Sequence, residues 1–361
     1  MFTKLTEKLD SFLEMGVPFY DCIVMKDGRC LYRHSGGFTD AEKTVKVTGK
    51  EKYNIYSCTK LITCVAALQF WERGAFSLED ALSDYMPEFH HMTVKTKGGV
   101  VPAKNPILIK HLFEMTAGFS YNMRAPSILK CKEETGDRCE TRELVRRLAE
   151  DPLLFEPGER WEYSLCHDVL GALIEVVSGV SYGEYVRKNI FEPLGMSASF
   201  FPHDERQLDE VVDQYVYSAS VGVYERNRKN DYQVGWAYES GGAGCISTVE
   251  DYVKFMEALR VGGVILKKET IDLMATDRLT EAQKKAYWMA PLGYGYGLGQ
   301  RCPKDETLSD FGWGGAAGAY YAIDRKRGLT LYLATHVLSF AEYQNIRWDI
   351  LPIIQKIVDQ I

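Results

Sequence analysis

Apolar residues at the beginning of the chain have first helical and then strand-like spacing. Leucine and phenylalanine recur every three or four positions over residues 3–15, which predicts an amphipathic helix. Two short apolar runs follow, at residues 19–25 and 30–34, with the turn-forming pair Asp27-Gly28 between them. Apolar runs joined by such a pair are typical of a β-hairpin.

A similar arrangement recurs near the end of the chain. Apolar runs over residues 319–323 and 329–335 flank a charged turn, and residues 340–361 have helical spacing. The interior has mainly helical patterns that stop at Gly or Pro. The helices expected there cover residues 61–71, 141–149, 168–177 and 182–191. A capping box from Ser247 to Glu250 begins a further helix that ends near Arg260.

These elements predict an α+β fold. An antiparallel sheet built from both chain ends and flanked by helices carries an inserted all-helical domain. We expect the sheet domain to comprise residues 1–56 and 230–361, and the mainly helical domain residues 57–229. A chain of 361 residues that is 46% hydrophobic and 26% charged has the composition of a globular protein with about two domains.

Charge and cysteine usage narrow the setting. The 43 basic and 50 acidic residues give a net charge of −7 without long like-charged runs, so we expect neither nucleic acid nor membrane as a partner. The nine scattered cysteines indicate reduced thiols. The first residues lack the apolar stretch of a signal peptide. We therefore expect a cytoplasmic protein, and the sequence leaves its oligomeric state open.

The chain lacks the common signatures of metal, nucleotide and α/β-hydrolase sites. The seven histidines show no HxxxH, HxxEH or Cys-His ligand spacing, so we expect no metal. Neither GxxxxGK[ST] nor a strand-GxGxxG-helix order is present, so we expect no cofactor. The nucleophile elbow GxSxG is absent too.

Two segments have the spacing S-x-x-K, one from Ser57 to Lys60 and one from Ser127 to Lys130. This spacing places a nucleophilic hydroxyl and an amine on one helix face, but a chain of this length contains about one or two such segments by chance. The Ser127 segment leads into a polar stretch that we expect to be a solvated loop. Ser57 instead begins an almost wholly apolar stretch, which is typical of a buried helix.

A lysine in the first turn of a buried helix is well placed to activate a serine. Desolvation and the positive end of the helix dipole both favour its neutral amine. Such an amine at Lys60 would activate Ser57 as a nucleophile. The motif alone also fits a structural role, in which Ser57 caps the helix and Lys60 extends its amine to water.

Two later segments change this balance. Tyr163 lies just before the helix expected from residue 168, and the glycine-rich segment 311–318 leads into an expected strand. Taken singly, Tyr163 fits a half-buried aromatic residue with a satisfied hydroxyl, and the glycines fit a bend or bulge at a sheet edge.

Taken together, these segments resemble the serine β-lactamase and penicillin-recognising superfamily, most closely its class C-like branch with the family VIII carboxylesterases. The resemblance covers nearly the whole chain. It rests on Ser57 and Lys60, on Tyr163 within PGERWEYS, and on Trp313 and its two following glycines at the position of the family's Lys-Thr-Gly. Further similar stretches are HLFEMTAGF at 111–119, PLGM at 193–196 and GGAGCIST at 241–248.

The resemblance implies a catalytic serine between an α/β domain and an all-helical domain. Ser57 would be acylated by a carbonyl substrate, and Lys60 would take or relay its proton. Tyr163, as a phenolate stabilised by nearby positive charge, would be the general base. The backbone N–H groups of Ser57 and Ala316 would hold the oxyanion.

The implied substrate-binding positions both match and depart from the family pattern. Gly314 and Gly315 match, because a strand without side chains lets an acyl group lie against its backbone. Leu165 stands where the β-lactamase pattern has an asparagine that binds an amide, and Trp313 replaces a lysine that pairs with a carboxylate. Losing one charge-assisted hydrogen bond costs about 1.5–3 kcal/mol, so we expect a preference for uncharged esters.

The sequence therefore predicts a serine hydrolase that forms an acyl-enzyme at Ser57 and hydrolyses carboxylic esters, with a small-molecule acyl substrate as its partner. Three alternatives stay open. They are acyl transfer to an alcohol by the same residues, β-lactamase or D-amino-acid peptidase activity, and a non-catalytic ligand-binding or scaffold protein. The joint presence of Ser57, Lys60 and Tyr163 argues against the last, because a scaffold does not need it.

Overall fold

A seven-stranded antiparallel sheet forms the centre of the computed structural model, which describes residues 1–218, 220, 222–227 and 229–361. The strands, in spatial order, are β2 (Arg29–Gly37), β1 (Phe19–Lys26), β13 (Leu329–Ala334), β12 (Tyr320–Asp324), β11 (Asp310–Gly314), β10 (Arg301–Pro303) and β9 (Tyr294–Tyr296). The amino-terminal hairpin pairs with the carboxyl-terminal one, with Ile23 opposite Tyr332. The predicted sheet from both chain ends is therefore confirmed.

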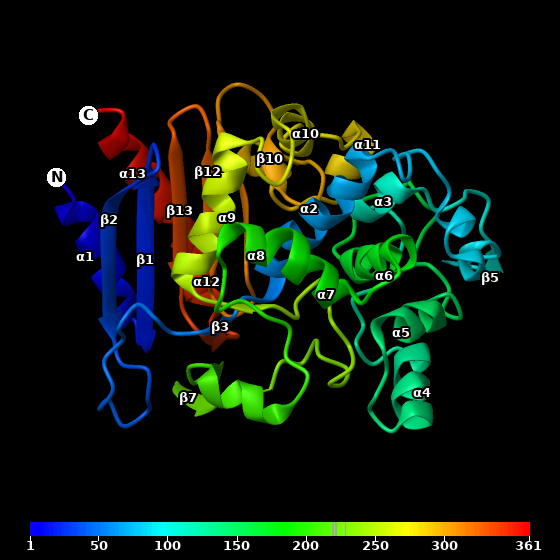
Figure 1. The fold of residues 1–361 in the computed structure, drawn as a ribbon, viewed down its shortest axis with the longest axis horizontal. Helices are drawn as coiled ribbons and strands as arrows, with labels where there is room; N and C mark the ends of the chain where they lie inside the picture. Colours follow the sequence, from blue (N-terminus) through cyan, green and yellow to red (C-terminus); the bar gives the residue numbers. More distant parts are fainter. Residues whose placement is uncertain (219, 221, 228) are drawn as a thin grey trace.

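Helices cover both faces of the sheet, which explains why every residue of β13 is buried. Tyr321 and Tyr332 both pack against Tyr252 of α9 (Val249–Val261), with ring centroids 5.6 and 4.7 Å apart. Tyr320, which precedes Tyr321 in β12, points to the opposite face of the sheet and packs against Trp348, because side chains alternate between faces along a strand. Figure 1 shows α1 (Thr3–Glu14) and α13 (Ile350–Val358) beside β1 and β2, close to both chain ends.

The carboxyl-terminal helical segment is interrupted once. Helix α12 (Ala341–Ile346) is followed by a 3₁₀ turn (Arg347–Asp349) and then by α13. The turn brings two adjacent side chains, Arg347 and Trp348, to the end of the sheet strands.

The middle of the chain supplies most of the other helices. They are α2 (Thr59–Glu72), α3 (Ile109–Phe113), α4 (Pro126–Thr135), α5 (Thr141–Leu148), α6 (Cys166–Ser178), α7 (Tyr182–Val186) and α8 (Glu192–Leu194), with α10 (Lys268–Met274) and α11 (Glu281–Lys284) later in the chain. Figure 1 shows α3, α4, α5 and α6 on the right, away from the sheet, with α8 beside α9. Small strand groups join β4 (Thr93–Thr96) with β5 (Gly99–Pro102), β3 (Tyr53–Asn54) with β8 (Ile246–Ser247), and β6 (Tyr215–Ser218) with β7 (Val223–Arg226) and β14 (Val337–Leu338). The domain boundaries expected at residues 57 and 229 stay a prediction.

Two local expectations were wrong. Ser127 does not precede a solvated loop, because Pro126 occupies the first turn of α4 and the Ser127 hydroxyl is buried against Asp151. The cap of α9 is Thr248 rather than Ser247, and the Thr248 side chain accepts a hydrogen bond from the backbone N–H of Asp251 at 3.1 Å.

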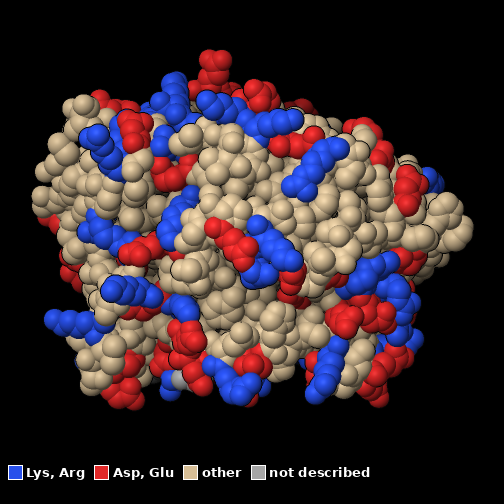
Figure 2. Space-filling view, in the orientation of Figure 1, with Lys and Arg blue, Asp and Glu red and all other residues tan. Residues whose placement is uncertain are grey.

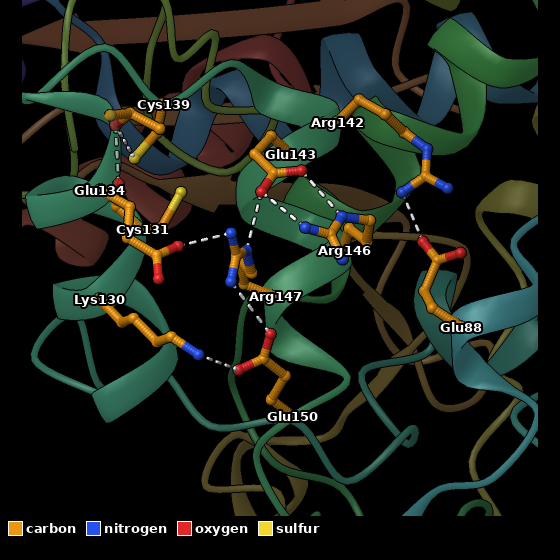
Figure 3. A network of polar contacts seen from close by, with 11 residues as sticks. Glu88, Lys130, Cys131, Glu134, Cys139, Arg142, Glu143, Arg146, Arg147 and Glu150 are labelled. Carbon is orange, nitrogen blue, oxygen red and sulfur yellow. Dashed lines mark hydrogen bonds and ion pairs between the residues drawn. The ribbon is translucent and has the colours of Figure 1, made fainter.

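Ion pairs connect the neighbouring helices α4 and α5 at the edge of the helical region (Figure 3). Arg147 contacts Glu134 at 2.6 Å, Glu143 at 2.7 Å and Glu150 at 3.4 Å. Such a network ties the end of α4 to α5 across the turn between them. Cys131 and Cys139 lie beside this network as free thiols.

Basic and acidic side chains are interspersed over the face shown in Figure 2. In the part of the chain that the structure describes, no single helix is long and apolar enough to cross a membrane. Only α6 and the helical segment from Tyr182 to Leu194 meet the length and composition criteria together, and they are bent by 77° at their junction.

The buried His336 makes the stability of the fold depend on pH. Burial lowers the pKa of His336 to about 4, and the ring accepts a hydrogen bond from the backbone N–H of Asn54 at 3.2 Å through Nε2. The unfolded chain therefore binds more protons than the folded one between the two pKa values, about 4 folded and about 6.5 unfolded. The free energy of unfolding accordingly falls as the pH is lowered through this window.

We expect His336→Asn to flatten this pH dependence by up to about 1.4 kcal/mol per pH unit. Urea unfolding of both proteins at several pH values from 7 to 4 measures the difference in slope, and the same substitution at the exposed His90 is the control. Parallel slopes for wild type and His336→Asn would show that other groups dominate.

Candidate active site

Ser57 lies in a 3₁₀ turn (Tyr56–Cys58) that leads directly into α2. The residue before it, Tyr56, has a φ of +47°, a backbone conformation that costs a non-glycine residue about 1–3 kcal/mol. Tyr56 is held there because it is fully buried and its hydroxyl donates to Gln214 at 2.7 Å. This turn presents the Ser57 hydroxyl to a cleft instead of using it as a helix cap.

Lys60 lies behind Ser57 in the first turn of α2 and is only 1% exposed. Its Nζ donates to the Gly242 carbonyl at 2.7 Å, to the Tyr121 hydroxyl at 3.1 Å and to Ser57 Oγ at 3.4 Å. The three N–H donors of the side chain thus have three acceptors. Lys60 does not extend to water, so the structural alternative considered for this motif does not hold.

A buried carboxylate fixes the backbone that receives the Lys60 amine. Asp168 accepts from the hydroxyls of Tyr238 and Ser240, each at 2.6 Å, and from the Gly242 N–H at 3.3 Å. These bonds hold the segment that carries the Gly242 carbonyl. Asp168 was not predicted as a site residue, because in sequence it is one polar position in an apolar helix.

Tyr163 stands closest to the nucleophile, with its hydroxyl 2.6 Å from Ser57 Oγ. Its ring is stacked between Tyr121, at 5.3 Å and 8°, and Trp313, at 5.7 Å and 25°. Lys60 Nζ lies 4.7 Å from the Tyr163 ring centroid and 5.0 Å from that of Tyr121. A positive charge at this position is attracted to the negative face of the Tyr163 ring and would stabilise negative charge on its oxygen.

Tyr121 is a further site residue that the sequence analysis missed. Burial raises the pKa of Tyr121 well above its usual value, with the neighbouring Tyr163 as the next cause. Its hydroxyl therefore stays protonated while it accepts from Lys60. Sequence gives little signal for this role, because Tyr121 lies in a short loop between α3 and α4.

The end of β11 lies against the Ser57 turn. A Cβ on Gly315 would lie 2.6 Å from the Ile55 carbonyl oxygen, and one on Gly314 would lie 2.5 Å from the Arg347 guanidinium. Close packing therefore excludes a side chain at both positions. Both glycines also line the cleft, and room for an acyl group against their backbone stays a prediction. Ala316 follows and lines the same cleft as Ser57.

The cleft above Ser57 has a volume of about 650 Å³ and is mainly aromatic. Its lining residues are Ser57, Tyr121, Tyr163, Tyr232, Trp288, Met289, Trp313, Gly314, Gly315, Ala316, Ser339, Ala341, Gln344, Arg347 and Trp348. Arg347 is the one charged side chain among them, and none of them is acidic.

Leu165 differs from the other predicted positions. It precedes α6, is 3% exposed, and lines a small separate cavity with Phe119 and Leu153. The structure therefore brings Ser57, Lys60, Tyr163, Trp313, Gly314, Gly315 and Ala316 together, but not Leu165. Its side chain belongs to the buried hydrophobic core.

Comparison with known proteins agrees with this geometry. The model of the beta-lactamase family matches residues 17–352. A lovastatin esterase of Penicillium rubens is 31% identical over 306 residues, which cover 76% of each chain. The esterase EstB of Burkholderia gladioli is 27% identical over 342 residues, which cover 87% of this chain and 84% of its own.

A solved structure extends the likeness to the fold. EstCE1, described as a hydrolase with promiscuous acyltransferase activity, matches with a TM-score of 0.76 at 24% identity and covers 93% of this chain and 94% of its own. The family match extends over nearly the whole sheet and all the helices around Ser57, and the predicted resemblance is confirmed. The chain belongs to the beta-lactamase family.

Proposed function

We propose that this protein hydrolyses carboxylic esters of small, uncharged, apolar acids through an acyl-enzyme at Ser57. The observation that carries the proposal is the contact of Ser57 Oγ with the Tyr163 hydroxyl at 2.6 Å and with Lys60 at 3.4 Å, at the floor of an aromatic cleft. A serine in such contact with a base and a cation has the arrangement of an activated nucleophile.

Acylation begins when Ser57 Oγ attacks the ester carbonyl carbon and passes its proton to the Tyr163 oxygen. For this transfer Tyr163 must enter the step as a phenolate, and the Lys60 ammonium, 4.7 Å from the ring centroid, would stabilise that negative charge. The carbonyl oxygen becomes an oxyanion, which accepts hydrogen bonds from the backbone N–H groups of Ser57 and Ala316. The C–O bond to the alcohol then breaks as Tyr163 returns the proton to the leaving oxygen.

Deacylation repeats these steps with water. Tyr163 takes a proton from the water that attacks the acyl carbon, and Ser57 Oγ leaves and recovers the proton. Both half-reactions need only the ester, water and the side chains named above.

The cleft lining supports an apolar, neutral substrate. Trp313 contributes a ring face and an indole N–H, which lies 3.4 Å from the Tyr163 hydroxyl, where the family pattern has a lysine. Esterase names among the relatives, including the lovastatin esterase and EstB, agree with this substrate class. The same features disfavour β-lactam or D-amino-acid peptide substrates, which carry a carboxylate.

Acyl transfer is the second candidate. The cleft opens to solvent over Ser57, so an alcohol can take the place of the hydrolytic water at the acyl-enzyme. The description of EstCE1 as a hydrolase with acyltransferase activity favours keeping this candidate. Product analysis in the presence of an alcohol separates the two reactions.

We also infer a reducing compartment such as the cytoplasm. All nine cysteines are free thiols, and eight of them are buried. Thiols in this state fit a compartment in which disulfides do not persist.

We expect a fluorophosphonate to add once per chain, and only at Ser57. Intact-protein mass spectrometry of the wild type gives the adduct mass, and peptide mapping locates it. Ser57→Ala, which removes one oxygen, is expected to show no adduct and no ester turnover with an unchanged melting temperature. Stoichiometric labelling of folded Ser57→Ala would identify a different nucleophile.

We expect Tyr163→Phe to lower kcat for an aryl ester by about 10²- to 10⁴-fold, because general-base catalysis contributes this much. Tyr121→Phe is the matched control, since it removes a hydroxyl from the neighbouring ring that contacts Lys60 at 3.1 Å. Its loss in kcat should be smaller, at most about tenfold. Equal losses in steady-state assays of the two variants would assign the base elsewhere.

We expect Trp288→Ala to raise KM for esters with an aromatic acyl group by about three- to tenfold, in line with the worth of an aromatic contact. Trp288 is 55% exposed, and its ring centroid lies 5.9 Å from those of both Tyr163 and Trp313. KM for the acetyl ester of the same alcohol should stay within about twofold, because acetyl is too small to reach the indole.

Trp236 provides the control for this substitution. It is 36% exposed and is not among the cleft-lining residues, so Trp236→Ala should leave both KM values unchanged. An equal rise of KM for acetyl and aromatic esters in Trp288→Ala would contradict a role of Trp288 in acyl selection.

A further inference from the structure

The backbone that follows β11 is held by the carboxyl-terminal part of the chain. The carbonyl groups of the four consecutive residues 315–318 each accept a hydrogen bond from a side chain in the segment 335–347. The donors are Arg347 Nη1 to Gly315 at 3.0 Å, Gln344 Nε2 to Ala316 at 2.8 Å, Thr335 Oγ1 to Ala317 at 2.9 Å and the Tyr343 hydroxyl to Gly318 at 3.0 Å. This loop is therefore fixed carbonyl by carbonyl.

The first of these bonds determines where the Ala316 N–H points. The Gly315 carbonyl and the Ala316 N–H belong to one trans peptide, so they point in opposite directions. Arg347 and the Gly318 N–H, the latter at 3.1 Å, hold the Gly315 carbonyl on one side. The Ala316 N–H is consequently turned to the other side, and a flip of this peptide would break both bonds.

The charge of Arg347 is unusual for a buried side chain. It is 7% exposed, and among the residues that the structure describes it forms no ion pair with an Asp or Glu carboxylate. Arg301, which is 1% exposed, is in contrast paired with Asp310. Burial lowers the pKa of Arg347, which shows that the fold holds this cation at a cost.

We propose that Arg347 is a positioning residue of the oxyanion hole, which orients and polarises the Gly315–Ala316 peptide through the Gly315 carbonyl, and that Gln344 supports it from the next carbonyl. This inference rests on the proposed function. A cation bonded to a peptide carbonyl strengthens the N–H of the same peptide as a donor, because hydrogen bonds in series polarise one another. The unpaired charge therefore acts on the oxyanion through one peptide unit.

This arrangement adds specific support at the moment when charge develops. The ester carbonyl is neutral in the ground state and anionic in the tetrahedral state. A stronger, fixed donor at Ala316 favours the second state more than the first, so removal of Arg347 should weaken tetrahedral species selectively.

Phenylboronic acid provides a direct probe of the tetrahedral state. Ser57 Oγ forms a bond to boron and gives its proton to Tyr163, and the boron becomes a tetrahedral anion with one oxygen in the hole. We compare the wild type with Arg347→Met, Arg347→Lys and Gln344→Met. The quantities to be measured for each protein are the inhibition constant of phenylboronic acid and kcat/KM for two phenyl esters, one neutral and one with a carboxylate on its acyl group. Binding of the neutral ester is measured in the Ser57→Ala background.

We expect Arg347→Met to weaken phenylboronic acid and to lower kcat/KM by the same factor, about 10- to 100-fold. Ester binding in the Ser57→Ala background should change less than about twofold, because the ground state makes little use of the hole. Arg347→Lys should recover part of both losses by keeping the charge. Gln344→Met, a half-buried position, should cause a smaller parallel loss and carries the test if Arg347→Met does not fold.

Three results would overturn the inference. Unchanged boronate inhibition in folded Arg347→Met would show that Arg347 does not act on the hole. A loss confined to esters with a carboxylate would show that Arg347 binds substrate directly. A wild type that forms no boronate adduct at Ser57 would overturn the proposed function as well, whereas the first two results overturn this inference alone.

Discussion

A buried primary amine that cannot reach water must find its hydrogen-bond acceptors inside the protein, and this constraint on Lys60 organises the whole site. Its acceptors come from three places that are distant in sequence, namely the turn of Ser57, the loop of Tyr121 and the backbone at Gly242. Moving any one of these acceptors away would leave an N–H donor of the buried Lys60 amine without a hydrogen bond. Asp168 extends the same constraint, because it fixes the backbone at Gly242 from α6. The Ser57 turn, the Tyr121 loop and the backbone at Gly242 are thereby joined at one nitrogen atom.

The aromatic stack over this nitrogen determines what kind of molecule the cleft can recognise. Trp313 retains an N–H near the Tyr163 hydroxyl but brings no charge, so recognition depends on apolar area and ring contacts. The cation that does line the cleft, Arg347, uses one guanidinium nitrogen on the backbone. Lys60 and Arg347 thus each donate to a backbone carbonyl group, that of Gly242 and that of Gly315.

Much of this organisation was predictable from the sequence, and the exceptions have physical reasons. Hairpins and long helices follow from local spacing, and Ser57, Lys60 and Tyr163 followed from motifs in a fixed order. Tyr121 and Asp168 escaped notice because their importance lies in contacts across the fold, which a single tyrosine in a loop or aspartate in a helix does not reveal. Leu165 was assigned by its distance from Tyr163, but its side chain belongs to the buried hydrophobic core. The close packing at Gly314 and Gly315 involves Arg347 and Ile55, which are distant in sequence, so the glycine run alone does not reveal it.

The pairing of β1 with β13 has a consequence for how the protein is made. Asp21 of β1 is paired with Ala334 of β13. Strand β1 can therefore form this strand pair only after more than 300 further residues have been synthesised. Contacts of such long sequence separation are slow to form, because loop-closure entropy must be offset before they stabilise the fold. The residues that tether the loop after β11 are likewise synthesised after the loop itself. Ser57 and Lys60 are thus synthesised early, and a polypeptide interrupted before residue 340 contains the loop after β11 but lacks Tyr343, Gln344 and Arg347, which hold three of its carbonyl groups.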